Sequence, residues 1–568
     1  MGANGGGAAP AYNRVMSDPL LVPMPLARGS RGAVVAPHHL ATGAGLVVLA
    51  AGGSAVDAAI ATNAALAVVM PSGCGIGGDA FWLIWDAAAR HEHALNGSGR
   101  SPDGADAATL RDRGHATVPL RGGLAVTVPG AVRSWADAHE RFGRLSRAAV
   151  LAPAIELARD GFPAYDAFVN AVEVTAGVLD NASSAGFHTV YRPAGRPWRP
   201  GEIVRLPALA ATLARLGDEG FGAFYEGDIA DRQCRALAAA GSAITADDLA
   251  AHRSTWTQPI ATTYRGVRIT THPPNSSGVV ALELLNILER FEPPAPETFP
   301  AGDSRWIHLG IEASKLAMAD RDAQLTDPEH YDVPVDRLVD KGYAADLAAR
   351  IDGDRAARPP AATVPRGGGT IYLATADADG NAVSLIESNY MGFGSGVVDP
   401  DTGVHYQNRG SFFSLDPDHP NVLAPRKRTL HTLMPAMLFD ERNGRVGGSP
   451  WVVVGSMGGD AQPQIHAQVV SGLVDGGLDV RSAVSVPRWF VEPDEHFAPP
   501  VEVRAEPRFG AGVLDALREM GHPVTETEPF DGWLGHCHAI ELVDGGPTVG
   551  GSFAAATDPR STGLPAVR

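Results

Sequence analysis

The sequence predicts an α+β protein in which two β-sheets pack face to face beneath outer helices. Strand-like stretches occur in both halves of the chain, at 80–85, 264–272, 370–377 and 382–387, and helical stretches lie between them. Hydrophobic residues make up 45% of the 568 residues, which is enough for a large core. Sheets from both halves bury their apolar faces against each other and under helices, so we expect this layered arrangement.

The charge and cysteine content argue against several classes of protein. The net charge of −18 is spread along the chain, which disfavours nucleic acid or an anionic membrane surface as a partner. The three cysteines, Cys74, Cys234 and Cys537, lie far apart without a Cys-x-x-Cys pair. We therefore expect a reducing compartment and no disulfide framework.

The N-terminus has no basic start followed by an apolar run, so we expect a disordered tail over 1–30, no signal peptide and a cytoplasmic protein. The most apolar stretch, 41–70, is interrupted by Gly52-Gly53, Asp57 and Asn63. It predicts two buried helices rather than a membrane span: residues 33–51 lead into the first, and 55–70 form the second.

A glycine-rich loop at 72–79 follows these helices and leads into the strand 80–85. Its glycines Gly73, Gly75 and Gly78 formally match the dinucleotide fingerprint. That fingerprint needs a strand before it and a helix after it, and here the order is reversed. We expect a turn that lets a helix pack on a strand, and no nucleotide cofactor.

The next part of the chain is mainly helical, and 183–202 is expected to be a surface excursion. Beyond the strand 264–272 we expect further helices, and then the Arg-, Pro- and Gly-rich linker 353–369. The expected helices are 131–141, 148–160, 205–216, 227–240, 246–252, 278–290, 304–323 and 335–352.

The character of the chain changes to strands after the linker. Asp377-Ala-Asp-Gly-Asn381 between two apolar stretches predicts a β-hairpin of 370–377 and 382–387. The other expected strands are 404–408, 433–439, 450–455, 500–505, 537–543 and 548–554, with helices at 460–474 and 509–520.

Common hydrolase and metal motifs are missing from the sequence. It contains no G-x-S-x-G and no H-E-x-x-H, and the pairs His91/His93 and His536/His538, the latter flanking Cys537, would each need a further ligand to hold a metal. We therefore expect no metal and no other cofactor.

Thr370 can be read in two ways. The triglycine 367–369 can be a plain linker before the hairpin, or the chain can be cut between Gly369 and Thr370. A cut gives Thr370 a free α-amine with a pKa of about 8, which suits a general base for its own hydroxyl. The backbone N–H groups of Gly458 and Gly459, at a helix start, could hold the resulting oxyanion.

The residues around Thr370 resemble those of a known family, the γ-glutamyltranspeptidases, which are N-terminal-nucleophile (Ntn) hydrolases. The resemblance covers nearly the whole chain. Its markers are Gly53-Ser-Ala-Val-Asp57, Pro71-Ser-Gly, Gly77-Gly78, Arg100, Pro273-Pro-Asn-Ser-Ser-Gly278, Ala319-Asp-Arg321, Gly369-Thr370, Asp377-Ala-Asp-Gly-Asn381, Phe393-Gly-Ser-Gly396, Lys427-Arg428, Gly455-Ser-Met-Gly-Gly459 and Asp558-Pro-Arg560.

This resemblance implies a four-layer αββα sandwich formed by two subunits of one autocleaved, initially inactive precursor. The large subunit would span 31–369 and the small one 370–568. Thr370 would attack a γ-glutamyl or related amide and pass the acyl group to water or an amine. Ser388 would hydrogen-bond the nucleophile, while Arg100, His431 and Thr432 would hold the substrate carboxylate.

The sequence departs from the family where the α-ammonium of a γ-glutamyl group would bind. The receiving positions become Tyr390 (beside Asn389), Arg409 and Phe412. A desolvated, unpaired ammonium costs roughly 3–5 kcal/mol, so we expect glutathione-like compounds to be poor substrates. Glutaryl-like acyl groups, as in cephalosporin acylases, would suit Arg100 and Arg409 better.

Two alternatives stay open at this point. Arg409 could point to solvent while another acid replaces the lost one. The protein could also be an uncleaved, non-catalytic binder of small carboxylates.

Overall fold

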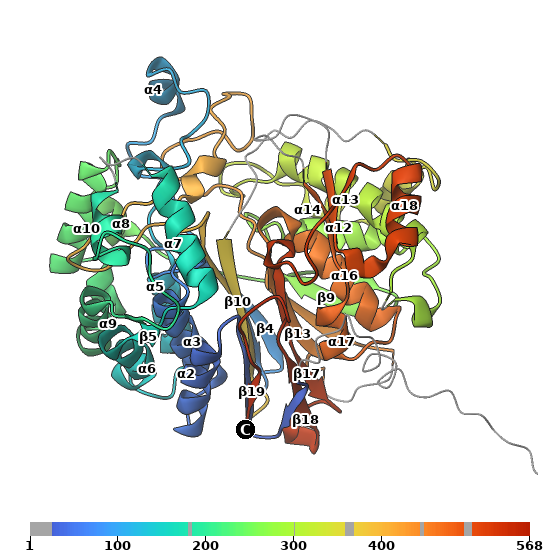
Figure 1. Cartoon of the computed structure of the whole chain (residues 1–568), viewed down its shortest axis with the longest axis horizontal. Helices are drawn as coiled ribbons and strands as arrows, with labels where there is room; N and C mark the ends of the chain where they lie inside the picture. Colours follow the sequence, from blue (N-terminus) through green and yellow to red (C-terminus); the bar gives the residue numbers. More distant parts are fainter. Residues whose placement is uncertain (1–24, 180–183, 300, 358–368, 443–447, 493–501) are drawn as a thin grey trace, which may run out of the picture.

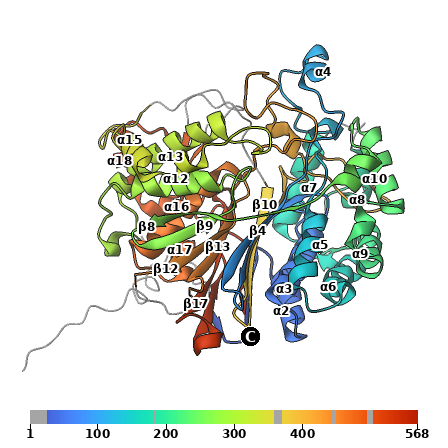
Figure 2. The same ribbon diagram turned by 180° about the vertical axis from the view of Figure 1, so that it is seen from behind.

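The computed structural model describes residues 25–179, 184–299, 301–357, 369–442, 448–492 and 502–568. Two seven-stranded sheets lie face to face in the middle of the molecule, and helices cover the outer face of each (Figures 1 and 2). Within the described residues, all neighbouring strands of these two sheets pair antiparallel. The two packed sheets under outer helices agree with the sequence-based expectation.

Each sheet contains strands from both sides of Thr370. The first has the order β1-β18-β17-β13-β12-β9-β8, and the second β19-β2-β10-β11-β3-β4-β7. The strands of the first sheet are β1 (Ala27–Gly29), β8 (Ile260–Tyr264), β9 (Val267–Thr271), β12 (Ala436–Asp440), β13 (Val452–Met457), β17 (His536–Val543) and β18 (Ser552–Ala556). Those of the second are β2 (Gly32–Val35), β3 (Asp79–Asp86), β4 (His91–Gly97), β7 (Thr255–Thr257), β10 (Gly369–Asp377), β11 (Ala382–Tyr390) and β19 (Ala566–Val567).

The two-residue period of strand β10 decides where Thr370 points. Tyr372 and Ala374 lie in the core between the two sheets, whereas Ile371 and Leu373 lie in the core under the helices. Successive side chains of a strand point to opposite faces. Thr370 is therefore directed into the space between the sheets.

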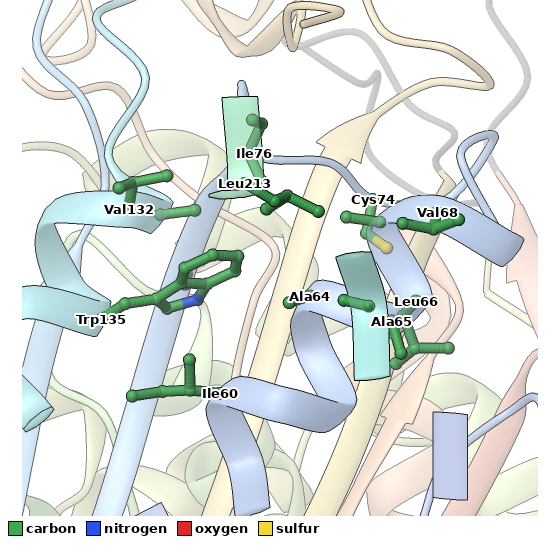
Figure 3. Packing of buried hydrophobic residues seen from close by; sticks show 14 of the residues in the cluster. Ile60, Ala64, Ala65, Leu66, Val68, Cys74, Ile76, Val132, Trp135 and Leu213 are labelled. Carbon is green, nitrogen blue, oxygen red and sulfur yellow. The ribbon is translucent and has the colours of Figure 1, made fainter. Parts of the chain in front are cut away.

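Helices α2 (His39–Ala50), α3 (Ala55–Val69), α5 (Ala131–Phe142), α6 (Arg147–Asp160) and α9 (Pro207–Glu219) form the main layer on the second sheet. Every residue of α3 is buried, because the helix is apolar on all sides, and a capping box of Ser54 and Asp57 begins it. Figure 3 shows Ile60 and Ala64 of α3 near Trp135 of α5. Close packing of small residues fixes this layer against the strands that carry Thr370.

The helices over the first sheet include α12 (Gly278–Leu288), α13 (Ser304–Gln324), α16 (Gln462–Val474) and α17 (Val480–Ser485). Beside them, α18 (Ala511–Glu519) packs with a small sheet of β14 (Trp489–Glu492), β15 (Glu502–Ala505) and β16 (Val524–Glu526). The remaining helices and strands are α4 (Ala107–Asp112), α7 (Asp166–Val178), α8 (Ala185–Tyr191), α10 (Asp228–Ala239), α11 (Ala246–Ala251), α14 (Val335–Leu338), α15 (Lys341–Ala348), β5 (Phe162–Pro163) and β6 (Ile203–Val204).

The predicted hairpin is confirmed. Strands β10 and β11 pair along their length, and the Asp377 carboxylate accepts hydrogen bonds from the N–H groups of Asp379 and Asn381 in the turn. None of the helices in the described ranges is both long and apolar enough to cross a membrane.

Several element boundaries were predicted wrongly. Residues 404–408 make only isolated bridges, because their partners lie in loops, at Val398 and Gly77. The helical stretches expected over 335–352 are present as α14 and α15, and Asp340 caps the second. The excursion 183–202 contains α8. Of the expected tail, residues 27–29 form β1 on β18, while 1–24 lie outside the described residues, as does most of the linker.

Candidate active site

Thr370 lies at an irregularity in the pairing of β10 with β11. Gly369 pairs with Tyr390 and Ile371 with Glu387, so Thr370 alone faces both Ser388 and Asn389. Such a bulge re-aims side chains and is common beside active sites. Here it brings the Thr370 and Ser388 hydroxyls together on the inner face of the sheet.

A chain of hydrogen bonds joins Thr370 to the carbonyl group that precedes it. The Thr370 hydroxyl donates to Ser388 Oγ at 3.0 Å, and the Ser388 hydroxyl donates to the Gly369 carbonyl oxygen at 2.6 Å. The backbone N–H of Tyr390 donates to Ser388 Oγ at 2.7 Å and fixes its position. Ser388 thus polarises the carbonyl next to the Thr370 hydroxyl.

Arg409, in the short 3-10 helix Arg409–Phe412, reaches the same hydroxyls. Its guanidinium donates to Ser388 Oγ at 3.3 Å and to Thr432 Oγ1 at 3.1 Å. The side chain is buried, with 1% of the residue exposed. The alternative in which Arg409 points to solvent is therefore wrong, because the cation lies beside Thr370.

The three positions that depart from the family form one cluster. The Arg409 guanidinium lies 4.6 Å from the Tyr390 ring centre and 5.1 Å from that of Phe412. Burial lowers the pKa of Arg409 to about 10, so it stays charged at neutral pH. Its Nε–H has no hydrogen-bond partner within the described part of the chain. A buried cation held by aromatic faces, with N–H groups to spare, can receive a carboxylate.

Asp79 is a site residue that the sequence analysis missed. It is directly opposite Ser388 in the pairing of β3 with β11, and it is fully buried. Its Oδ1 accepts from the Gly99 N–H at 2.8 Å, and its Oδ2 lies 3.2 Å from His431 Nε2. The available signal was a charged residue ending a glycine-rich loop at the start of an apolar strand.

Burial governs the protonation of this pair. It raises the pKa of Asp79 to about 7, although the Gly99 N–H and the charge of Arg409 favour the carboxylate. The pKa of His431 is held well below its usual range by burial and by Arg409, so His431 is neutral. Asp79 is therefore the member of this pair that gains or loses a proton near neutral pH.

Gly458 and Gly459 connect the end of β13, a strand of the first sheet, to the start of α16. The first turn of a helix carries N–H groups without intrahelical acceptors, which suits an oxyanion site. Arg321 of α13 forms ion pairs with Asp460 and, at 2.7 Å, with Asp322. This buried link, also missed, ties the glycine pair to α13.

A second ionic cluster lies behind the same loop. Arg488 donates to the Gly535 carbonyl at 2.7 Å and pairs with Asp558 at 2.5 Å, and Arg560 also pairs with Asp558, at 3.1 Å. Burial alone would raise the pKa of Asp558, but the two arginines hold it well below its usual range. A side chain at Gly535 would collide with Met457, so the cluster supports the strand end before Gly458.

Two of the expected substrate-binding residues are engaged elsewhere. Arg100 pairs with Asp327 at 3.2 Å and with Glu329 at 2.7 Å. Asn389 lies on the other face of β11 from Ser388, and its amide contacts His405 Nε2 at 2.7 Å. The structure therefore brings Thr370, Ser388, Tyr390, Arg409, Phe412, His431 and Thr432 together, and places Arg100 and Asn389 apart from them.

One group of three metal-ligand-type side chains comes together within the described ranges: His308, Glu312 and His522. His308 Nδ1 is 2.8 Å from His522 Nε2, and the Glu312 carboxylate pairs with the Lys315 ammonium at 2.6 Å. The group joins α13 to the segment after α18, and a cation is already present at its carboxylate.

Comparison with known proteins agrees with this geometry. The model of the family Gamma-glutamyltranspeptidase matches residues 41–567. A glutathione hydrolase-like YwrD proenzyme of Bacillus subtilis (strain 168) is 41% identical over 94% of this chain and 98% of its own length. An oxamate amidohydrolase proenzyme of Klebsiella pneumoniae is 38% identical over 94% and 98%, respectively.

A solved structure agrees as well. The cephalosporin acylase from Bacillus halodurans is 38% identical and superposes with a TM-score of 0.86, covering 97% of this chain and 99% of its own. The matches to sequence and structure run across nearly the whole protein. This chain therefore belongs to the gamma-glutamyltranspeptidase family.

Proposed function

We propose that the protein is a self-processing N-terminal-threonine amidohydrolase of the Ntn type that cleaves amides whose acyl group ends in a carboxylate. The observation that carries the proposal is the hydrogen-bonded chain from Thr370 through Ser388 to the Gly369 carbonyl. It places a hydroxyl nucleophile next to a polarised carbonyl, as self-cleavage requires.

Processing follows from this arrangement. The Thr370 oxygen attacks the Gly369 carbonyl carbon, the C–N bond breaks and the hydroxyl proton passes to the amide nitrogen, so the Gly369–Thr370 amide becomes an ester on Thr370 with a free α-amine. Water hydrolyses the ester and leaves fragments 1–369 and 370–568. The amine of Thr370 then serves as the base for the Thr370 hydroxyl, because its pKa of about 8 matches the working pH.

Turnover repeats this chemistry on a substrate. Thr370 attacks the amide carbonyl, the N–H groups of Gly458 and Gly459 hold the oxyanion, and the amine leaves. The acyl-enzyme then passes to water or to an acceptor amine. Thr432 lies next to Arg409 and accepts a hydrogen bond from it, and His431 precedes Thr432 in the chain.

Arg409 determines which acyl groups the site accepts. A substrate carboxylate gains charge-assisted hydrogen bonds to the free N–H groups of Arg409. An α-ammonium on a γ-glutamyl group would instead meet this cation and the two aromatic rings beside it, a mismatch of roughly 3–5 kcal/mol. We therefore expect glutathione and other γ-glutamyl compounds to be poor substrates.

The length of the acyl group follows from the distances. Thr370 Oγ1 is 3.0 Å from Ser388 Oγ, which is 3.3 Å from Arg409 Nη2, so the two distances add to an upper limit of 6.3 Å between nucleophile and cation. An acyl carbonyl adjacent to its carboxylate, as in oxamate, spans only about 1.5 Å between the two carbons. An extended glutaryl group spans about 5 Å. The short limit favours acyl groups of two or three carbons at Arg409.

Glutaryl amides form a second candidate class, which a separate observation favours. Arg100 is a second arginine, 23% of whose side chain is exposed, and its ion pairs with Asp327 and Glu329 set it apart from the Arg409 cluster. A glutaryl carboxylate would bind Arg100 only by displacing one of these two acidic partners.

The test begins with a denaturing gel and N-terminal sequencing of the purified protein. Two bands, with the smaller one starting Thr-Ile-Tyr-Leu, are expected; a persistent single band would support the non-catalytic alternative. Hydrolysis of oxamate, malonamate, succinamate and glutaramate is then compared by ammonia release, beside glutaryl- and γ-glutamyl-p-nitroanilide. Faster turnover of the γ-glutamyl compound than of its glutaryl counterpart would overturn the assigned specificity.

A further inference from the structure

Strand pairing places the buried carboxylate of Asp79 beside Ser388. It faces Ser388 across β3 and β11, and it shares a hydrogen bond of 3.2 Å with His431. The next residue, Thr432, accepts a hydrogen bond from Arg409. Asp79 is therefore linked to Arg409 on two sides, through Ser388 and through the His431-Thr432 segment.

Arg409 itself has no carboxylate at ion-pair distance within the described part of the chain. Its hydrogen-bond acceptors there are the neutral hydroxyls of Ser388 and Thr432. Asp79 and Asp460 act on it electrostatically from farther away. Arg409 is thus a buried cation whose charge is only partly balanced. A substrate carboxylate would compete with Asp79 as the counter-ion of Arg409.

We propose that Asp79 is a specificity-tuning residue: its carboxylate balances Arg409 in the empty site, and binding of an anionic acyl group is coupled to uptake of one proton by the Asp79–His431 pair. This inference rests on the proposed function, because it requires that Arg409 receives the substrate carboxylate. It adds that the affinity of Arg409 for the substrate carboxylate depends on the protonation of the Asp79–His431 pair.

The charges of the groups around Arg409 determine how affinity for the substrate anion changes with pH. Two anions beside one guanidinium repel each other, so the bound carboxylate favours protonated Asp79. Burial raises the pKa of Asp79 to about 7, so Asp79 is mostly protonated below that pH. Affinity for the anion is then greatest at acidic pH and falls as the pH rises through 7. Uptake of one proton corresponds to a rise in KM of about tenfold per pH unit at most.

Other ionisable groups near the pair are the same in wild-type protein and in an Asp79 variant, so they do not distinguish the two. After the proposed processing, the α-amine of Thr370, with a pKa of about 8, also changes charge in this window. Glu387 lies on the opposite face of β11, where burial raises its pKa to about 8. The remaining groups with an electrostatic influence on the pair are Arg428, Tyr225 and His272. A difference in pH dependence between wild type and an Asp79 variant therefore reports on Asp79.

The test compares processed wild-type protein with Asp79→Asn, using oxamate as the anionic substrate and its neutral diamide, oxamide, as the control. For wild type, KM for oxamate is expected to rise between pH 6 and pH 8.5, while KM for oxamide stays level. In Asp79→Asn this rise is expected to be smaller than in wild type. The same rise in both proteins, or in both substrates, would overturn the proposal.

A second measurement needs no variant and covers the case in which Asp79→Asn fails to process. Wild-type protein is titrated calorimetrically with propionate in phosphate and in Tris, two buffers of different ionisation enthalpy. Proton uptake predicts different apparent binding enthalpies at pH 7.5 and equal ones at pH 5.5. Equal enthalpies at both pH values overturn the coupling alone. Absence of both oxamate hydrolysis and propionate binding overturns the proposed specificity together with it.

Discussion

Replacing Arg409 by methionine separates the role of its charge from the role of its bulk. Two of the five N–H groups of Arg409 are bound to hydroxyls, of Thr432 and Ser388, which leaves three for a substrate. Two hydrogen bonds from a charged donor to a carboxylate contribute roughly 1.5–3 kcal/mol each. Arg409→Met is therefore expected to weaken transition-state binding of an anionic acyl amide by at least about 3 kcal/mol. This corresponds to a fall in kcat/KM of more than about a hundredfold.

The assay compares oxamate with neutral oxamide in the wild type, Arg409→Met and the matched variant Arg100→Met, after a gel has shown that each is processed. Only oxamate hydrolysis by Arg409→Met is expected to fall sharply. The melting temperature of Arg409→Met is expected to be equal or higher, because a buried charge is often replaced by an apolar side chain without loss of stability. Equal losses for both substrates, or a loss below fivefold for oxamate, would refute the assignment of Arg409 as the carboxylate receptor.

Three further predictions concern processing and stability. Thr370→Ala is expected to remain a single 59.1 kDa chain without turnover, whereas Thr370→Ser keeps a nucleophile and still cleaves; cleavage of the alanine variant, seen on a gel, would remove Thr370 from its role. Arg321→Met leaves Asp460 in a buried site without this partner, and is expected to lower kcat by tenfold or more with a smaller change in KM; unchanged kcat would mean that the Gly458 loop does not depend on this link. Asp558→Asn leaves two buried arginines without their shared carboxylate and is expected to cost roughly 3–5 kcal/mol in the free energy of unfolding at pH 7. Because the folded-state pKa of Asp558 is depressed, its contribution is present above the unfolded value of about 4 and is lost as the pH falls below it, so the difference in melting temperature should be constant from pH 8 to 5 and shrink in acid.

The hairpin around Asp377 was predictable because its information is local. An aspartate, a glycine and an asparagine between two apolar stretches specify the turn, and strand alternation then fixes the face to which Thr370 points. Residues 404–408 show the limit of such reasoning. Their sequence favours a strand, but their backbone groups pair with distant loops, so no ladder forms.

The character of the site depended on contacts between distant segments. The sequence marks Tyr390, Arg409 and Phe412 as unusual one by one, but only the fold places the guanidinium against the two neighbouring rings. Asp79 went unnoticed because its meaning comes from the register between β3 and β11, which joins positions more than 300 residues apart. Local patterns carry no information about that pairing.

The interleaving of strands has a consequence for the lifetime of the processed protein. β2 lies between β10 and β19, and β18 lies between β1 and β17, so each proposed fragment contributes strands within both sheets. Separating the fragments would break backbone ladders on both sides and open the core between the sheets. The proposed cut after Gly369 would therefore break a peptide bond without separating the two fragments. If the two fragments were made in separate cells, neither would offer a complete sheet for the other to pair with. We therefore expect that the active protein must be synthesised as one chain.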